Sequence, residues 1–178
     1  MTWDIAQALQ ERLVAEGLKV VLTRNGANEK VLNRRRAEIA NECNAALMIR
    51  LHCDAGSGTG YAVYYPATTG TVDKVTGPSK DVLAKSHVAA TKVHEAMAKA
   101  LDGKLKDDGL KTDRQTAVGA KQGALTGSIY SKVPVVLVEM VVLTNPKDEA
   151  FIASNSGKTA MVEALAGGVL AAIGRQKP

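Results

Sequence analysis

Two side chains that can do chemistry each follow an apolar run of the sequence. Glu139 comes directly after residues 133–138, and His52 comes directly after residues 45–51. Such runs are typical of strands that are buried on both faces of a sheet. An ionised carboxylate in that setting is costly unless another group pairs with it or a reaction uses it. Because sites in open α/β sheets form at the carboxyl ends of strands, we expect His52 and Glu139 to mark a functional site.

Each of these side chains also has a purely structural interpretation. Glu139 can form a salt bridge with Arg50, which shares a strand face with His52. His52 can bond to a backbone group at the end of its strand. Cys53 stands next to His52 and is an alternative nucleophile, although neighbours on a strand point to opposite faces. The residues alone leave these alternatives open.

The surrounding sequence predicts helices and strands that position both side chains. Helices are predicted where apolar residues recur at helical spacing, and strands where they run continuously or alternate. The predicted helices cover residues 3–16, 29–43, 79–101, 148–152 and 156–173. The predicted strands cover residues 18–23, 45–52, 60–65 and 133–138. This order predicts a single α/β domain with a mixed, mainly parallel sheet and helices on both faces.

The remaining segments are predicted to be irregular. Residues 66–78 form a loop rich in Thr and Gly, and residues 102–109 form a charged turn. Residues 110–130 are expected to be a loop with some helix that forms a wall of the site. Within the helix of residues 29–43, Cys43 is predicted to face the core, and Arg36 is expected to have a structural role.

Composition narrows the class of protein. The 178 residues suit one domain, and 46% are hydrophobic but only 3% aromatic, so the core is built mostly from Ala, Val, Leu and Ile. The net charge of +5 is spread along helical segments without interleaved aromatic residues. This pattern disfavours nucleic-acid binding and suits an anionic cell envelope. Two cysteines make no disulfide framework. No apolar run is long enough to span a membrane, and no signal peptide precedes the first predicted helix.

Taken in order, the motifs resemble the zinc-dependent N-acetylmuramoyl-L-alanine amidase family of the amidase-3 type. That family has a strand that ends in His and a short polar turn, similar to Leu-His-Cys-Asp-Ala at residues 51–55. It later has a Pro-led strand that ends in Glu, then a hydrophobe, a small polar residue and Asn-Pro, similar to residues 134–139 and 143–146. The stretch VVLTR at residues 20–24, followed by Leu32, Arg36, Ala40 and Asn41, also matches in order and spacing. The resemblance covers nearly the whole chain.

The resemblance implies an enzyme of the cell envelope that acts on peptidoglycan. The bond cut would be the amide between N-acetylmuramic acid and L-alanine of the stem peptide. By the family's pattern, His52 corresponds to one of three zinc ligands, and Glu139 corresponds to the general base.

One part of the family's pattern has no counterpart in this sequence. Its other two ligands, a His and a Glu, and its first strand precede the helix that residues 2–9 match. We therefore expect an amidase-3-like catalytic domain over residues 1–178 that is incomplete at its N-terminal side. Alternatively, other residues such as His87, Asp54 or Glu16 complete the metal site. His87 and His94 lie seven residues apart on one predicted helix, which is a further spacing that ligands can use.

Two more expectations follow from the missing strand. A chain without the other ligands can be a catalytically silent remnant, or a peptidoglycan-binding module that holds no metal. A sheet that lacks a central strand leaves backbone groups and apolar faces open, which predicts self-association through the gap.

Overall fold

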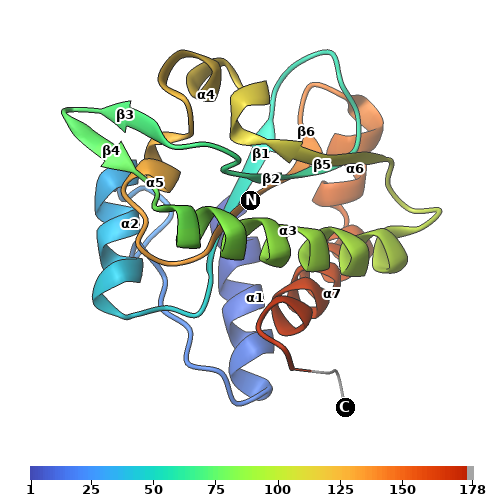
Figure 1. Ribbon diagram of the computed structural model, residues 1–178. Helices are drawn as coiled ribbons and strands as arrows, with labels where there is room; N and C mark the ends of the chain where they lie inside the picture. Colours follow the sequence, from blue (N-terminus) through green and yellow to red (C-terminus); the bar gives the residue numbers. More distant parts are fainter. Residues whose placement is uncertain (176–178) are drawn as a thin grey trace.

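The computed structural model describes residues 1–175 as one α/β domain (Figure 1). Its helices are α1 (Thr2–Ala15), α2 (Asn33–Glu42), α3 (Lys80–Leu101), α4 (Ala117–Gln122), α5 (Thr126–Ile129), α6 (Pro146–Ala153) and α7 (Asn155–Ala172), with a 3₁₀ turn at Asp113–Gln115. Its strands are β1 (Met48–Asp54), β2 (Tyr61–Tyr65), β3 (Gly70–Val72), β4 (Val75–Gly77), β5 (Asp107–Thr112) and β6 (Val135–Val142).

Four strands form the main sheet, in the order β1-β6-β2-β5. The β1–β6 and β2–β5 pairs are parallel, whereas β2 and β6 are antiparallel. The sheet is therefore mixed and mainly parallel, as the sequence predicts. Strands β3 and β4 form a separate two-stranded ribbon.

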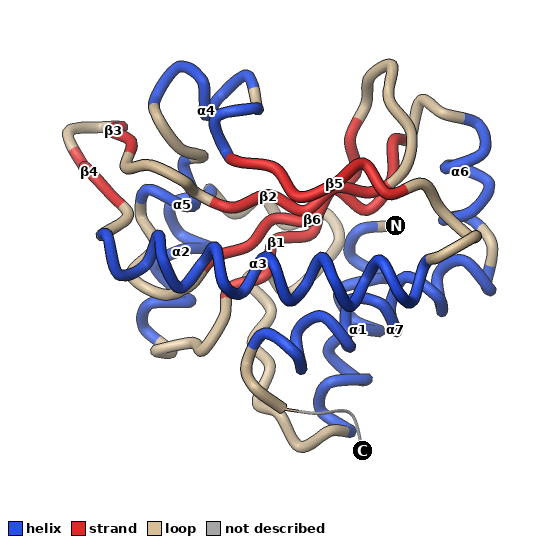
Figure 2. The backbone as a smooth tube through the Cα atoms, turned by 45° about the vertical axis from the view of Figure 1, so that its right-hand side comes forward, coloured by secondary structure: helices blue, strands red, loops and turns tan. Residues whose placement is uncertain are grey.

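Helices cover both faces of the main sheet (Figure 2). On one face, α1, α3 and α7 bury the largest apolar cluster against the sheet, with Leu9, Val93, Val138 and Leu165 among its members. On the other face, Ala37 and Ala40 of α2 pack against the beginning of β1. No helix among residues 1–175 is long and apolar enough to cross a membrane.

Local capping explains where the later helices begin. The side chain of Asn145 accepts from the backbone N–H of Lys147 at 3.0 Å, and Pro146 fills the first position of α6, where a missing N–H costs nothing. Ser154 caps α7 by accepting from Gly157 N–H at 2.9 Å. These caps place α6 directly after β6, beside the end of the strand that carries Glu139.

Several sequence-based predictions about elements are wrong. The charged turn predicted at residues 102–109 contains the start of β5, and the loop predicted at residues 66–78 contains the β3–β4 ribbon. The second helix is shorter than predicted, so that Cys43 lies exposed at its end rather than in the core.

Residues 18–23, predicted as a buried strand, are not a strand in the structure. Their burial still alternates, because Leu18, Val20 and Leu22 are half-buried while Lys19 and Val21 are exposed. No backbone–backbone hydrogen bond joins residues 19–24 to another described residue. The segment therefore keeps the side-chain pattern of a strand but has no neighbour to pair with.

Candidate active site

His52 and Glu139 lie side by side in the second halves of β1 and β6. The sequence places Glu139 at the end of its strand, but β6 continues through the apolar residues 140–142. The two residues are partners in the parallel register, so their side chains lie on the same face of the sheet. His52 Nδ1 is 4.0 Å from Glu139 Oε1, which is too long for a hydrogen bond. Asp54, two residues after His52, follows on the same strand. The fold thus brings together the two candidate residues that the sequence places 87 positions apart.

The environment of Glu139 favours the protonated form of its carboxyl group up to nearly neutral pH. Burial, with the negative charge of Asp54 nearby, raises the pKa of Glu139 to about 7, although the Arg50 guanidinium acts in the opposite direction. Its Oε2 atom is buried and has no hydrogen-bond partner among the described residues. A carboxylate with such a pKa and a free oxygen is suited to take up and release a proton.

His52 is a neutral imidazole at physiological pH. Burial by surrounding atoms, together with the charges of Arg50 and Arg36, lowers the pKa of His52 to about 4. Its side chain nevertheless remains 45% exposed, so one side of the ring is open to a ligand. A neutral imidazole has a lone pair available to a metal ion or to a hydrogen-bond donor.

Arg50 does not form the salt bridge that would give Glu139 a purely structural role. It shares the sheet face with His52, as expected, but its side chain makes no hydrogen bond or ion pair within residues 1–175. The side chain is only 6% exposed, and Nη1 is buried without a partner. Burial lowers the pKa of Arg50, although the neighbouring Asp113 favours its charged form.

Residues 113–130 cover the same face of the sheet, where a wall of the site is predicted. Leu125 packs against Ala62, Tyr64 and Leu137, and Ala62 is the partner of Glu139 in the antiparallel register. Asp113 fixes this segment, because its buried carboxylate accepts from Leu125 N–H at 2.9 Å. The position of the segment agrees with the prediction, and its function as a wall stays a prediction.

Cys53 is poorly placed as a nucleophile. It points to the opposite face from His52, where it packs against the core of α1 and the sheet. Burial raises the pKa of its thiol, which disfavours the reactive thiolate.

Of the alternative metal ligands, Asp54 follows His52 on β1, whereas the others lie apart from His52. His87 and His94 sit on α3, which covers the opposite face of the sheet; His87 stacks on Tyr65, and His94 bonds to Asp107 at 2.9 Å. Glu16 pairs with Arg12 at the end of α1. Within residues 1–175, no group of three His, Cys, Asp or Glu side chains is arranged to hold a metal ion.

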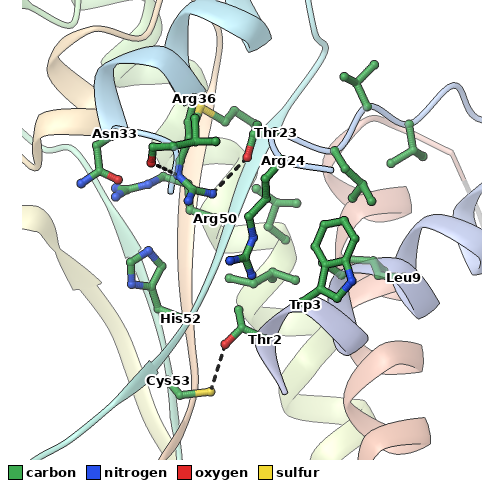
Figure 3. A pocket seen from close by; sticks show the side chains of 18 of the residues that line it. Thr2, Trp3, Leu9, Thr23, Arg24, Asn33, Arg36, Arg50, His52 and Cys53 are labelled. Atoms are coloured by element: carbon green, nitrogen blue, oxygen red, sulfur yellow. Dashed lines mark hydrogen bonds between the residues drawn. The ribbon is translucent and has the colours of Figure 1, made fainter. Parts of the chain in front are cut away.

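A groove of about 640 Å³ runs along the free edge of β1 and ends at His52 (Figure 3). Its walls come from α1, from residues 20–24 and 31–33, and from residues 48–53 of β1. Arg36 of α2 closes one side, where its guanidinium donates to Thr23 Oγ1 at 3.1 Å and to Val31 O at 3.0 Å. This bonding agrees with the structural role expected for Arg36.

Residues 1–171 match the sequence profile of the family described as N-acetylmuramoyl-L-alanine amidase. The chain belongs to this family. The match covers β1, β6 and both candidate residues, and so agrees with the resemblance seen in the motifs.

Individual relatives support the membership. This amidase-family chain is 26% identical over 180 residues to the N-acetylmuramoyl-L-alanine amidase CwlM of Mycobacterium tuberculosis, a match that covers 98% of the chain but 37% of CwlM. The chain therefore spans little more than a third of that curated relative.

Solved structures show the same fold. Ami1 from Mycobacterium smegmatis superposes with a TM-score of 0.77 at 22% identity, over 97% of this chain and 74% of Ami1. AmiC2 of Nostoc punctiforme superposes with a TM-score of 0.71 at 24% identity, over 93% of this chain and 78% of AmiC2.

One residue near the site was missed by sequence reasoning. Asp148 of α6 is 2% exposed, and its carboxylate accepts from Thr59 Oγ1 at 2.9 Å, Gly60 N–H at 2.6 Å and Val142 N–H at 3.1 Å. It thereby ties the loop after β1 to the end of β6. The helix start at Asn145-Pro146 predicts that an acidic residue in the first turn is favourable. Only the fold shows which groups that residue binds.

Proposed function

We propose that this protein hydrolyses the amide bond between N-acetylmuramic acid and L-alanine in peptidoglycan, at the cell envelope. Family membership supports the reaction class. The observation that carries the proposal is Glu139, a half-buried carboxylate with a raised pKa and a free oxygen, beside the neutral His52.

In this proposal Glu139 is the general base. It accepts a proton from the water that attacks the carbonyl carbon, and returns that proton to the L-alanine nitrogen as the C–N bond breaks. Its pKa near 7 suits both transfers. At neutral pH the carboxylate is basic enough to accept the proton, and the carboxyl group is acidic enough to give it up again. Residues 113–130, which cover the same face of the sheet, limit the access of bulk water to Glu139 from one side.

Zinc is a separate part of the proposal. When bound, zinc supplies a water of lowered pKa. Within the described residues His52 is one suitable donor, but three protein donors are needed and no such cluster is present. These residues alone therefore do not fit a zinc site. We propose zinc binding at His52 only for a form of the protein in which further ligands lie close enough to bind the same metal ion.

The lack of a three-donor cluster among residues 1–175 also favours a second candidate. A domain that keeps the fold but hydrolyses nothing would bind peptidoglycan without turnover. Pull-down on purified peptidoglycan together with a turnover assay distinguishes the two, since the second candidate retains binding and releases no stem peptide.

The substitution Glu139→Gln tests the catalytic role. Glutamine keeps the shape and a polar tip but cannot accept the proton, so release of stem peptide should fall by about 10²–10⁴-fold. In a form of the protein that supplies the further zinc donors, Glu139→Gln should leave the zinc content nearly unchanged, whereas His52→Ala should lower zinc content and activity together. Near-normal turnover by Glu139→Gln would refute the proposed role.

A further inference from the structure

Asn25 and Gly26 are neighbours in the loop that joins residues 20–24 to α2. Asn25 is exposed and Gly26 is partly exposed. In an Asn-Gly pair the backbone nitrogen of glycine is well placed to attack the side-chain carbonyl carbon of asparagine, because glycine has no Cβ to crowd the approach. A folded protein blocks this reaction where hydrogen bonds or packing hold either group. The contacts of the two residues therefore decide whether it occurs.

Neither reacting group has a hydrogen-bond partner among residues 1–175. The backbone N–H of Gly26 donates to no acceptor, and the side-chain amide of Asn25 makes no hydrogen bond. A Cβ placed on Gly26 would meet no atom beyond its chain neighbours within 4 Å, so open space surrounds the residue. The hydrogen bonds that shape the turn use other groups. Arg24 donates to Ala27 O at 3.0 Å, and the backbone N–H of Asn25 donates to the Glu29 carboxylate.

Two other asparagines show how the fold protects a side-chain amide. Asn28 lies in the same turn, but the backbone nitrogen that follows it belongs to Glu29, which carries a Cβ. That N–H already donates to Gly26 O at 3.3 Å. The side chain of Asn41 is itself held, because it donates to a backbone carbonyl at 2.9 Å and accepts from a backbone N–H at 2.8 Å. Asn25 has neither kind of protection.

We propose that Asn25 is a site of spontaneous deamidation in the folded protein. The Gly26 nitrogen loses its proton to hydroxide and forms a bond to Cγ of Asn25. The bond from Cγ to the side-chain nitrogen then breaks, and ammonia leaves. Water opens the resulting five-membered imide at either of its two carbonyl carbons, which gives aspartate or isoaspartate at position 25. The proposal does not rest on amidase activity.

The reaction leaves two signatures that can be measured. One neutral amide and one water become one carboxylate and one ammonium ion, so the net charge of the chain falls by one unit from +5. The isoaspartate product also lengthens the backbone by one carbon atom between residues 25 and 26. Cation-exchange chromatography separates the less positive product, and peptide mapping by mass spectrometry locates the change.

Incubation of the folded chain at mildly alkaline pH tests the inference. We expect Asn25 to convert at least about tenfold faster than Asn28, which corresponds to a barrier lower by about 1.4 kcal/mol. The unfolded chain in guanidinium chloride gives the rate that the sequence alone sets. Because a loop whose reacting groups are free opens at little cost, the folded rate at Asn25 should lie within about threefold of the unfolded rate.

Gly26→Ala and Gly56→Ala are matched variants for this experiment. A Cβ at either position meets no atom beyond its chain neighbours within 4 Å, so both variants should keep the fold. Gly26→Ala puts a methyl group beside the attacking nitrogen and should slow the conversion of Asn25 by about tenfold, the effect of about 1.4 kcal/mol in the barrier. Gly56→Ala changes a different exposed loop and should leave the rate at Asn25 unchanged.

Three outcomes would overturn the inference. The first is an unfolded chain that converts at Asn25 while the folded chain does not, because the fold would then protect the residue. The second is a folded chain in which Asn28 converts as fast as Asn25. The third is undiminished conversion in Gly26→Ala, which would show that the Gly26 nitrogen is not the attacking group.

Discussion

Glu139 and His52 are register partners on neighbouring parallel strands, with Oε1 of one 4.0 Å from Nδ1 of the other. The same neighbourhood shifts their pKa values in opposite directions, to about 7 for Glu139 and about 4 for His52. Both shifts favour the uncharged form, because burial is the first cause in each case. At neutral pH the pair is therefore an uncharged imidazole beside a carboxyl group that is close to its midpoint.

Glu139→Gln is expected to stabilise the metal-free protein above neutral pH. The folded protein holds the Glu139 proton more tightly than the unfolded chain, whose ordinary pKa is 4.5. The associated stability is complete below pH 4.5 and is lost as the pH rises through 7. Glutamine stays neutral, so the variant should gain about 2 kcal/mol over the parent at about pH 8 and little at about pH 4.5. Urea unfolding with a chelator present, at both pH values, measures the difference.

The exposed Glu149 of α6 provides the control for this measurement. Glu149→Gln should show no comparable change in the free energy of unfolding between the two pH values. A Glu139→Gln variant whose advantage over the parent does not grow with pH would show that burial of the carboxylate is not costly.

The chain of residues 1–178 by itself is expected to hold zinc weakly. His52 is one donor, and a single imidazole does not retain the metal through dialysis. Elemental analysis should find well below one zinc per chain, and His52→Ala should remove most of what remains. His87→Ala, on the opposite face of the sheet, is the matched control and should change nothing. Near-stoichiometric zinc in the parent would show that other residues complete a site.

Asp148→Ala should destabilise the fold without touching the candidate catalytic pair. It leaves the buried N–H groups of Gly60 and Val142 without their acceptor. The expected loss in the free energy of unfolding is about 3 kcal/mol. Asp81→Ala, which removes an exposed carboxylate paired with Lys85, should cost at most about 0.5 kcal/mol. Chemical denaturation measures both, and equal losses would argue against a structural role for Asp148.

We also propose that the isolated chain associates loosely as its concentration rises. Three of its exposed large apolar side chains line the open groove, namely Val21 at 46%, Leu32 at 79% and Leu143 at 37% exposure. Open edges and apolar patches promote contacts between chains. Sedimentation should show an average mass that increases with concentration, and Val21→Lys with Leu32→Lys should reduce it.

Val88 on α3 provides the control for association, since it is 56% exposed but lies outside the groove. Val88→Lys should leave the concentration dependence in place. A monodisperse monomer at high concentration would refute the proposed association.

The sequence by itself determined the fold class, the main elements and the two candidate residues. Continuous apolar runs mark β1 and β6, and the side chains that follow these runs, His52 and Glu139, become register partners in a mainly parallel sheet. The local sequence pattern did not predict strands correctly where the presence of a neighbouring strand decides whether a strand forms. Residues 18–23 have the alternation of a strand but no neighbour, whereas β5 lies in a charged stretch and forms because β2 offers it an edge.

Only the tertiary structure decided the chemistry of the site. The distance between His52 and Glu139, the burial that moves both pKa values, and the lack of a salt bridge to Arg50 depend on residues far apart in the chain. The groove is likewise invisible in the sequence, because its walls come from α1, residues 20–24 and β1. Hydrogen-bond pairing and desolvation are properties of neighbours in space, and a linear pattern specifies only which side chains are available to become neighbours.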